Sequence, residues 1–150
     1  MKIIAKQVGQ GNRSAEGMKQ IAEWIRSSGG YRWVGVYEVI KSEIGVIAFT
    51  GTEAPAHPRF PVTQGLCGAA VASKSTVNVG DVRKDPRWLT TFDSTRSEII
   101  VPVLSAGGRV AGLIDVESDR LDAFGREDTQ FLESCAFALP PLFAATPSKE

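Results

Sequence analysis

Three acidic side chains have the spacing in this sequence that most clearly suggests chemistry. Asp115 and Glu117 lie two residues apart in the apolar run Arg109–Glu117, and the two-residue period of a strand places them on one face. A two- or four-residue turn centred on Gly107-Gly108 sets Glu98 opposite Glu117, on that same face. A three-residue turn would send Glu98 to the other face, so the cluster depends on the strand register.

Carboxylates on one face of adjacent strands repel one another, and this face therefore needs a compensating partner. Water, arginine, a raised carboxyl pKa or a cationic ligand would each reduce the repulsion. One interpretation is a partly solvated face with Arg96 or Arg120 as partners. The other is a pocket for a positively charged group. Strand geometry alone leaves both interpretations open.

Two aromatic residues, Trp33 and Tyr37, lie four apart in the run Tyr31–Ile40 and share a face if that run is a strand. Most strand aromatics pack in a core. The functional alternative is a pocket wall, where aromatic rings flank a cation or an apolar group of a ligand.

The sequence has two cysteines and one histidine. Cys67 lies in G-L-C-G near the start of an expected short helix, where backbone amides can lower a thiol pKa, although small cysteines also pack well between small residues. Cys135 lies on a helical apolar stripe, which indicates packing. His57 lies in a proline-rich arm without a second histidine, and the cysteines have no metal-ligand spacing. We therefore expect no metal and no cofactor.

Composition excludes several partners. Lys and Arg number 17, as do Asp and Glu, in 150 residues, so no basic field attracts nucleic acid. No polybasic amphipathic stretch suggests a membrane surface, and no apolar run is long enough to cross a bilayer. The first residues lack the apolar run of a signal peptide. We expect one domain over residues 1–150, located in the cytoplasm, with reduced thiols.

Apolar periodicity predicts the elements that position these side chains. The alternation along Arg109–Glu117 puts Val110 on the face of Ile114, and Ala111 on the face of Leu113. Residues 1–11 and 146–150 are expected to be loose. The expected elements are a helix over Ser14–Ser28, a hairpin of Tyr31–Ile40 with Glu43–Thr50, an irregular arm over Gly51–Thr63, a short helix over Cys67–Ser73, a short strand over Thr76–Val79, a long polar loop over Gly80–Thr95, a hairpin of Ile99–Ser105 with Arg109–Glu117, and a helix from near Gly125 to Pro140. This order predicts an α+β domain with an antiparallel sheet.

Several of these segments resemble GAF domains, over about residues 14–139. The likeness is nearest to the free methionine-(R)-sulfoxide reductase family of single-domain GAF proteins. It is carried by W-V-G-V-Y at 33–37, G-L-C-G-A-A-V-A at 65–72, D-V at 81–82, S-E-I-I-V-P-V at 97–103, G-L-I-D-V-E-S at 112–118 and F-G-R-E-D at 124–128. The resemblance implies about six antiparallel strands, with the N- and C-terminal helices on one face, often forming a homodimer, and a ligand cup on the other.

The resemblance also assigns roles to residues. Trp33 and Tyr37 match the aromatic wall of the family's pocket. Glu98, Asp115 and Glu117 match the carboxylates that hold a free amino acid, although the family usually has aspartate in place of the third.

The redox residues of that family match less well. Such reductases use a catalytic cysteine in the loop before S-E-I and a resolving cysteine about ten residues before G-x-C-G. Thr91 and His57 occupy these positions here. A threonine hydroxyl is a far poorer nucleophile than a thiolate and forms no sulfenic acid. Only Cys67 remains, and in the family its counterpart is not the essential cysteine.

Three hypotheses follow. The first is a non-catalytic, sensor-type domain in signal transduction that binds a small amine-bearing metabolite, such as a free amino acid derivative, with no sulfur close enough to react. Its ligand-binding residues would be Trp33, Tyr37, Thr91, Glu98, Asp115 and Glu117. The second is a divergent methionine-(R)-sulfoxide reductase that uses Cys67 and an external thiol. The third is a structural dimer with a vestigial pocket. The sequence favours the first, because the amino-acid-holding residues persist where the redox residues do not.

Overall fold

The computed structural model describes residues 1–11 and 14–143. Its elements, in chain order, are α1 (Lys2–Gly9), α2 (Ala15–Gly29), β1 (Trp33–Ile40), β2 (Glu43–Thr50), β3 (Arg59–Pro61), α3 (Gly65–Ser73), β4 (Val77–Val79), η1 (Val82–Lys84), β5 (Ser97–Leu104), β6 (Val110–Ser118), α4 (Arg126–Ala138) and η2 (Pro140–Leu142). The six strands among the described residues form one antiparallel sheet in the order β3-β2-β1-β6-β5-β4. The predicted α+β fold is confirmed.

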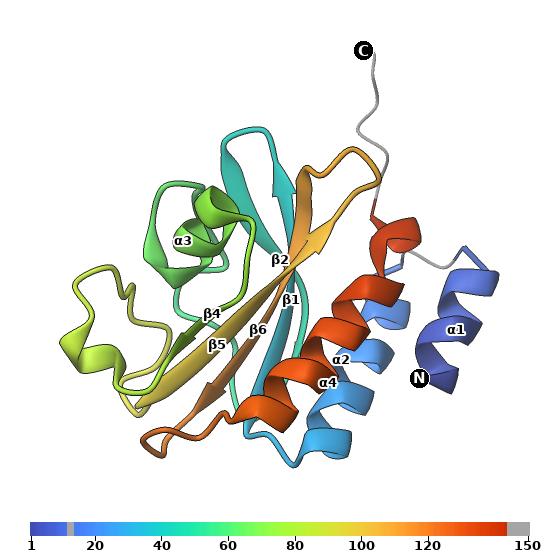
Figure 1. The fold of residues 1–150 in the computed structure, drawn as a ribbon. Helices are drawn as coiled ribbons and strands as arrows, with labels where there is room; N and C mark the ends of the chain where they lie inside the picture. The colour runs from blue at the N-terminus through green and yellow to red at the C-terminus, as the bar shows by residue number, and fades with distance from the viewer. Residues whose placement is uncertain (12–13, 144–150) are drawn as a thin grey trace.

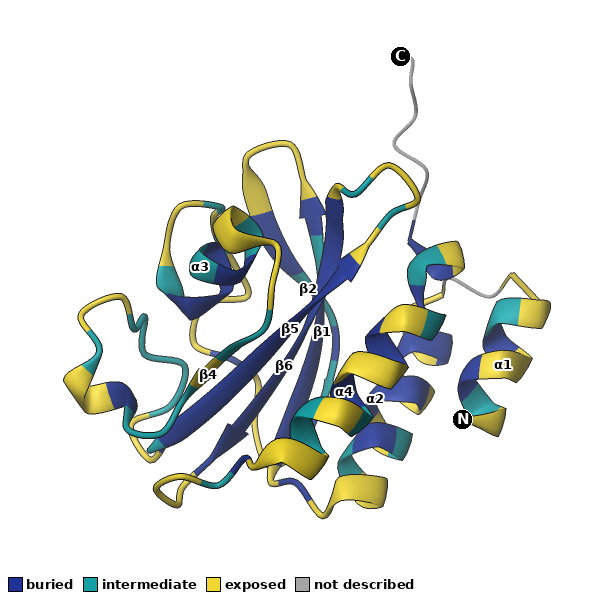
Figure 2. Ribbon diagram, viewed as in Figure 1, coloured by how far each residue is buried: buried dark blue, intermediate teal, exposed yellow. Residues whose placement is uncertain are grey.

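The sheet divides the molecule into two layers (Figure 1). Helices α1, α2 and α4 lie on one face, and α3 with the long loop after β4 lies on the other. Each face has its own apolar core, and Figure 2 shows the central strands buried along most of their length. The prediction of terminal helices on one face is confirmed. None of the described helices has the length and apolarity that a bilayer crossing requires.

The two long helices are bounded by local signals in the sequence. Ser14 caps α2, because its side chain accepts a hydrogen bond from the Gly17 amide at 3.0 Å. Gly30 ends α2 in the left-handed conformation, with φ of 68°. Asp128 secures the start of α4 by accepting from the Gly125 amide at 2.9 Å and from the Tyr31 hydroxyl at 2.8 Å. The second bond joins α4 to the segment that leads into β1.

The prediction that residues 1–11 are loose is wrong. Lys2–Gly9 form α1, in which Ile4 is fully buried against the helical layer. Gln7 is also buried and donates a hydrogen bond to Gln20 of α2 at 2.9 Å. Ile4 and Val8 lie four residues apart, a helical spacing too short for the sequence pattern to distinguish from chance. The expected loose tail at 146–150 lies outside the described residues.

The turn between β5 and β6 determines where the acidic residues lie. Three residues (106–108) separate Ser105 from Arg109, whose carbonyl accepts from the Ser105 amide at 2.8 Å. Leu104 pairs with Val110, whereas Val103 pairs with Gly112, so Ala111 is a one-residue bulge. Beyond this bulge Glu98 is opposite Glu117, as predicted. The bulge compensates for the three-residue turn, which alone would have reversed the face of Glu98.

The bulge also corrects the predicted alternation. Val110 belongs to the same core as Leu113, and Ala111 to the same core as Ile114. The predicted faces of Val110 and Ala111 are therefore wrong. Strict two-residue alternation holds only from Gly112 onward, because the unpaired residue shifts the preceding part of the strand to the opposite face.

Two connecting segments also differ from simple loops. The arm Gly51–Thr63 is not wholly irregular, because Arg59–Pro61 form β3 and extend the sheet beside β2. The long polar loop Gly80–Thr95 contains the short 3-10 helix η1. Asp81 caps that turn by accepting from the Arg83 amide at 3.1 Å. Both segments lie over the face of the sheet that carries the acidic residues.

Candidate functional site

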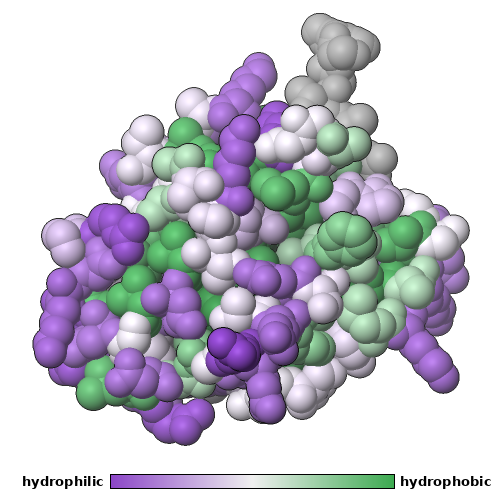
Figure 3. Space-filling model, in the orientation of Figure 1, coloured by the Kyte–Doolittle hydropathy of each residue, from purple (hydrophilic) through white to green (hydrophobic). Residues whose placement is uncertain are grey.

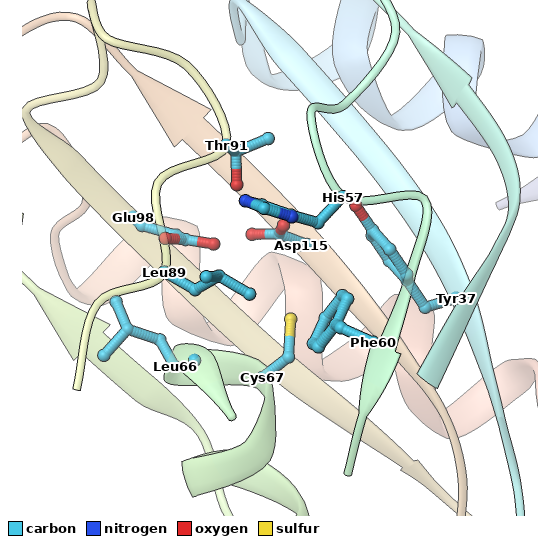
Figure 4. Close-up of a pocket in the computed structure, with 10 residues that line it drawn as sticks. Tyr37, His57, Phe60, Leu66, Cys67, Leu89, Thr91, Glu98 and Asp115 are labelled. Carbon is cyan, nitrogen blue, oxygen red and sulfur yellow. The ribbon is translucent and has the colours of Figure 1, made fainter. Parts of the chain in front are cut away.

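A cavity of about 20 Å³ lies on the face of the sheet opposite α1, α2 and α4. Its walls come from β1, the arm, α3, the long loop, β5 and β6. Figure 4 shows the lining side chains converging from these elements. The lining residues are Tyr37, His57, Phe60, Gly65, Leu66, Cys67, Leu89, Thr91, Glu98 and Asp115. Four of the six predicted ligand-binding residues are among them: Tyr37, Thr91, Glu98 and Asp115.

Strand β1 supplies the aromatic wall. Trp33 pairs with Glu117, and Gly35 with Asp115, so the aromatic residues lie beside the acidic ones across the ladder. Tyr37 lines the cavity, whereas Trp33 is not a lining residue and packs edge-on against Phe92 of the long loop, with ring centroids 5.3 Å apart. The Trp33 indole donates to the Glu53 carbonyl at 3.0 Å. Trp33 therefore fixes the walls, and its direct contact with a ligand stays a prediction.

Gly35 provides the space that these rings occupy. A Cβ atom on this residue would collide with the Trp33 ring and would lie 2.9 Å from Cε1 of Tyr37. Its own φ is not in the left-handed region, so the glycine is required by packing rather than by backbone conformation. The small residue lets both rings fold over β1 on either side of Asp115.

We expect the substitution Gly35→Ala to lower the free energy of unfolding by about 1–3 kcal/mol, the usual cost of overpacking. Chemical denaturation followed by tryptophan fluorescence measures the effect. Gly107→Ala is the matched control, because nothing lies within 4 Å of a Cβ at that position. Equal stability of the two variants would contradict this account of the aromatic wall.

The three carboxyl groups are almost completely removed from solvent. Glu98, Asp115 and Glu117 are 3%, 1% and 1% exposed. Oε1 of Glu117 accepts from the Thr95 hydroxyl at 2.8 Å. As ionised groups, Asp115 and Glu117 leave Oδ1 and Oε2 without a donor among the described residues. A buried acceptor without a donor is costly, so these oxygens indicate a missing proton or ligand.

The arginine-paired interpretation of this face is wrong for the part of the chain that the structure describes. The guanidinium of Arg96 donates to the backbone carbonyls of Asp93 and Thr95, at 2.9 and 3.0 Å. The ion pairs among the described residues involve neither Arg96 nor Arg120, and none involves the three buried carboxyl groups. Protons, water or a ligand are the partners that remain to reduce the repulsion.

Burial raises the pKa of all three carboxyl groups. The negative charge of Asp115 raises the pKa values of Glu98 and Glu117 further, whereas hydrogen bonds from these two glutamates lower the pKa of Asp115. Thr95 and Thr91 hydroxyl groups partly counteract the increase at Glu117. The pKa is raised most at the two glutamates, so Asp115 is the first of the three carboxyl groups to ionise as pH rises.

Cys67 lies within this acidic cluster. Its Sγ and one carboxylate oxygen each of Glu98 and Asp115 lie within 4.8 Å of one another, and Figure 4 shows the sulfur directed toward Asp115. The prediction that no sulfur lies close enough to react is therefore wrong. Sequence reasoning missed this because the three residues come from α3, β5 and β6, which only the fold brings together. Burial, and then the negative charges of the carboxylates, raise the Cys67 pKa.

Two other residues behave differently from Cys67. Cys135 is buried in the opposite core, where burial raises its pKa to about 11, in agreement with its predicted packing role. His57 is exposed, as predicted for a loop residue, but its ring also borders the cavity near Thr91 and Asp115 (Figure 4). Sequence reasoning assigned no site role to Phe60, Leu66 or Leu89, because an apolar residue in an arm, at the start of a short helix or in a loop carries no periodic signal.

The GAF domain family model matches residues 16–139. The chain is a GAF domain. GAF domains commonly bind small molecules, and the cavity lies where the resemblance placed the ligand cup. Free methionine-R-sulfoxide reductase of Saccharomyces cerevisiae is 35% identical over 107 residues, which cover 69% of this chain and 58% of the yeast protein. GAF domain-containing protein A of Dictyostelium discoideum is 30% identical over 125 residues, covering 83% and 77%.

Solved structures resemble this GAF domain across most of its length. A type II free methionine-R-sulfoxide reductase from Thermoplasma acidophilum has a TM-score of 0.81 and 36% identity, covering 85% of this chain and 90% of that one. The Neisseria meningitidis free methionine-R-sulfoxide reductase, solved in complex with its substrate, has a TM-score of 0.84 and 31% identity, covering 94% and 83%. The homologues of this domain therefore include methionine-R-sulfoxide reductases.

Proposed function

We propose that this GAF domain reduces free methionine-(R)-sulfoxide, with Cys67 as the nucleophile. The proposal rests chiefly on the position of the Cys67 sulfur, within 4.8 Å of carboxylate oxygens of Glu98 and Asp115. The similarity to methionine-R-sulfoxide reductases supports the choice of substrate. Asp115, the first of the three carboxyl groups to ionise, would hold the substrate ammonium, and Tyr37 would contact its apolar chain.

The first step, oxygen transfer from the substrate, needs only protein groups that the cavity brings together. Cys67 attacks the sulfoxide sulfur, and the oxygen passes to Sγ, which gives methionine and a sulfenic acid. Methionine sulfur gains the two electrons that the cysteine sulfur loses, and the thiol proton ends on the sulfenic oxygen. Glu98, protonated because of its raised pKa, would donate a hydrogen bond to the sulfoxide oxygen as the S–O bond weakens. An external thiol then condenses with the sulfenic acid and releases water, and a second thiol reduces the mixed disulfide.

The substrate itself would activate the thiol. Burial and the surrounding carboxylates keep Cys67 protonated, and a neutral thiol is a weak nucleophile. An ammonium group bound at Asp115 would cancel the negative charge that raises the Cys67 pKa. We therefore expect free methionine sulfoxide to react much faster than an N-acetylated form, which has no charge at that position.

Substrate entry requires movement of the walls. The cavity of about 20 Å³ accommodates one water-sized group, whereas pockets for small molecules usually measure about 300–1,000 Å³. The long loop carries Leu89 and Thr91, and the arm carries His57 and Phe60. We propose that the loop Gly80–Thr95 opens to admit the amino acid and closes over it.

The test is a turnover assay with separated sulfoxide epimers and dithiothreitol as the external thiol. We expect methionine to form from the free R epimer and not from the S epimer or from N-acetylated methionine sulfoxide. Absence of turnover, in a preparation whose Cys67 thiol is shown by mass spectrometry to be unmodified, would contradict the proposal.

Binding without reaction is the second candidate, and the raised pKa of Cys67 favours it. A sensor-type domain would hold an amine-bearing metabolite with Trp33, Tyr37, Thr91 and the three carboxyl groups, and would act in signal transduction. Because Trp33 and Trp88 both pack in the cavity-side core, tryptophan fluorescence should report the ligand. Saturable changes with free amino acids and no turnover would support the sensor, and a flat signal would leave the third hypothesis, a vestigial pocket.

We further propose a cytoplasmic location, because a thiol-dependent cycle needs a reducing compartment, and a homodimer formed through the terminal helices. Phe137 of α4 is 88% exposed, and Figure 3 shows hydrophobic surface on the side of α4. We expect Phe137→Glu to convert a dimer to a monomer without loss of stability. Light scattering coupled to size exclusion measures this, and a wild-type monomer would contradict the proposal.

A further inference from the structure

We propose that the closed cavity binds one thiophilic divalent cation, such as Zn²⁺, through Cys67, Glu98 and Asp115. The inference does not depend on sulfoxide reduction, although it concerns the same cavity. A cation there would occupy the nucleophile and the ammonium site together. Zn²⁺ and the amino acid would therefore exclude one another.

The spacing of the donor atoms fits a single ion. Sγ of Cys67 and one oxygen from each acid lie within 4.8 Å of one another. Tetrahedral Zn²⁺, at about 2.3 Å from sulfur and about 2.1 Å from oxygen, needs neighbouring ligand atoms about 3.5 Å apart. Contraction by up to about 1.3 Å, a change within the reach of side-chain rotation, would bring the three atoms to that spacing.

The size of the cavity also favours an ion over an amino acid in the closed state. The space of about 20 Å³ fits one atom or one water molecule. Asp115 is 1% exposed, lines the cavity, and, when the neighbouring glutamates are ionised, carries an Oδ1 atom without a hydrogen-bond donor among the described residues. A cation would satisfy that oxygen without any movement of the long loop.

The chemistry of the donors selects the kind of cation. One thiolate with two carboxylates suits Zn²⁺ and the related thiophilic metals. Ca²⁺ and Mg²⁺ prefer six or more oxygen ligands, and sulfur is a poor ligand for them. Glu117 would hold Asp115 in position for the metal. The Thr95 hydroxyl fixes Glu117 itself by donating to its Oε1 atom at 2.8 Å. The fourth position would face His57 and the mouth of the cavity (Figure 4).

Cobalt titration of the reduced, metal-free chain tests the inference, because thiolate-bound Co²⁺ has a near-ultraviolet charge-transfer absorption and tetrahedral Co²⁺ has strong visible bands. We expect both signals to saturate at one Co²⁺ per chain and to disappear when Zn²⁺ is added. The charge-transfer band should be lost in Cys67→Ser and kept in Cys135→Ser, whose sulfur lies in the opposite core.

The nearly isosteric variants Glu98→Gln and Asp115→Asn keep the thiol and the fold, so they test the site if Cys67→Ser folds poorly. Each should weaken Co²⁺ binding by at least about tenfold, the scale on which even outer-shell partners act. Free methionine should reduce the cobalt absorption by competition.

Two results would overturn the inference: no charge-transfer band in the wild type, or a band that survives in Cys67→Ser. Neither result affects the sulfoxide assay. Conversely, a Cys67-dependent band in a chain that shows no turnover would keep the metal site and remove the reductase proposal.

Discussion

Serine in place of Cys67 is expected to lower the rate of methionine-(R)-sulfoxide reduction by at least about a thousandfold, because loss of a nucleophile removes the covalent step itself. Cys135→Ser should keep turnover within a few-fold of wild type, since that thiol lies in the helix-side core. Single-turnover measurements without an external thiol should yield at most one methionine per chain from the wild type and none from Cys67→Ser.

The comparison is informative because both cysteines are buried and unpaired. Each serine substitution costs some packing, so activities are compared at a temperature where circular dichroism shows both variants folded. Dimedone, which traps sulfenic acids, should label Cys67 after exposure to substrate. Turnover that persists in Cys67→Ser would show that the sulfoxide is reduced elsewhere.

The stability of the protein in metal-free buffer should fall as pH rises above about 4.5. Glu98 and Glu117 have an unfolded-state pKa near 4.5, and their folded-state pKa values lie well above it because of burial and the charge of Asp115. Between those two values the folded chain keeps protons that the unfolded chain releases. The free energy of unfolding then decreases with pH, by about 1.4 kcal/mol per pH unit for each proton kept.

The pH range over which stability is lost follows from the direction of the two glutamate pKa shifts. Below the unfolded-state pKa both states are protonated and the full stability is present. It is lost progressively until pH exceeds the folded-state values, where both states are ionised. This is opposite to the usual behaviour of a salt-bridged carboxylate, which stabilises the fold as pH rises.

The double variant Glu98→Gln with Glu117→Gln should flatten this profile and should be more stable than wild type at pH 7. Urea denaturation at several pH values between 4.5 and 8 measures both effects. The surface variant Glu23→Gln is the control, because Glu23 forms only an exposed ion pair with Arg26. A wild-type stability that rises through this range would contradict the assignment of buried, proton-holding glutamates.

Periodicity predicted the parts of the fold where one face of an element is buried. The stripe of Met18, Ile21 and Ile25 predicted α2, and the alternation around Asp115 predicted the acidic face of β6. The same reasoning could not predict α1, since a single short apolar pair carries too little signal. The predicted elements α2 and β6 differ from the missed helix α1 in the length of their buried periodic pattern, not in the types of residue that they contain.

The sequence predicted the part of the site that lies within single strands, but not the contacts between distant segments. Residues two or four apart on one strand share a face by local geometry, which is why Trp33 and Tyr37, or Asp115 and Glu117, could be grouped. The approach of Cys67 to Asp115 depends on how α3 packs across β5 and β6, a contact between distant segments with no local pattern. Glu98 reached its predicted position through two deviations that cancel, the three-residue turn and the bulge at Ala111.

That cancellation makes one unpaired residue near a solvent-facing turn a determinant of the buried chemistry. Surface turns usually tolerate insertions and deletions, but a strand without the bulge, in which Ala111 pairs with Val103, would leave the three-residue turn uncompensated and set Glu98 opposite Val116. A carboxyl group would then enter the apolar layer beneath α2 and α4, and the acidic trio would be divided between two sides of the sheet. The pairing of Ala111, a residue that does not line the cavity, therefore determines whether the acidic groups meet there.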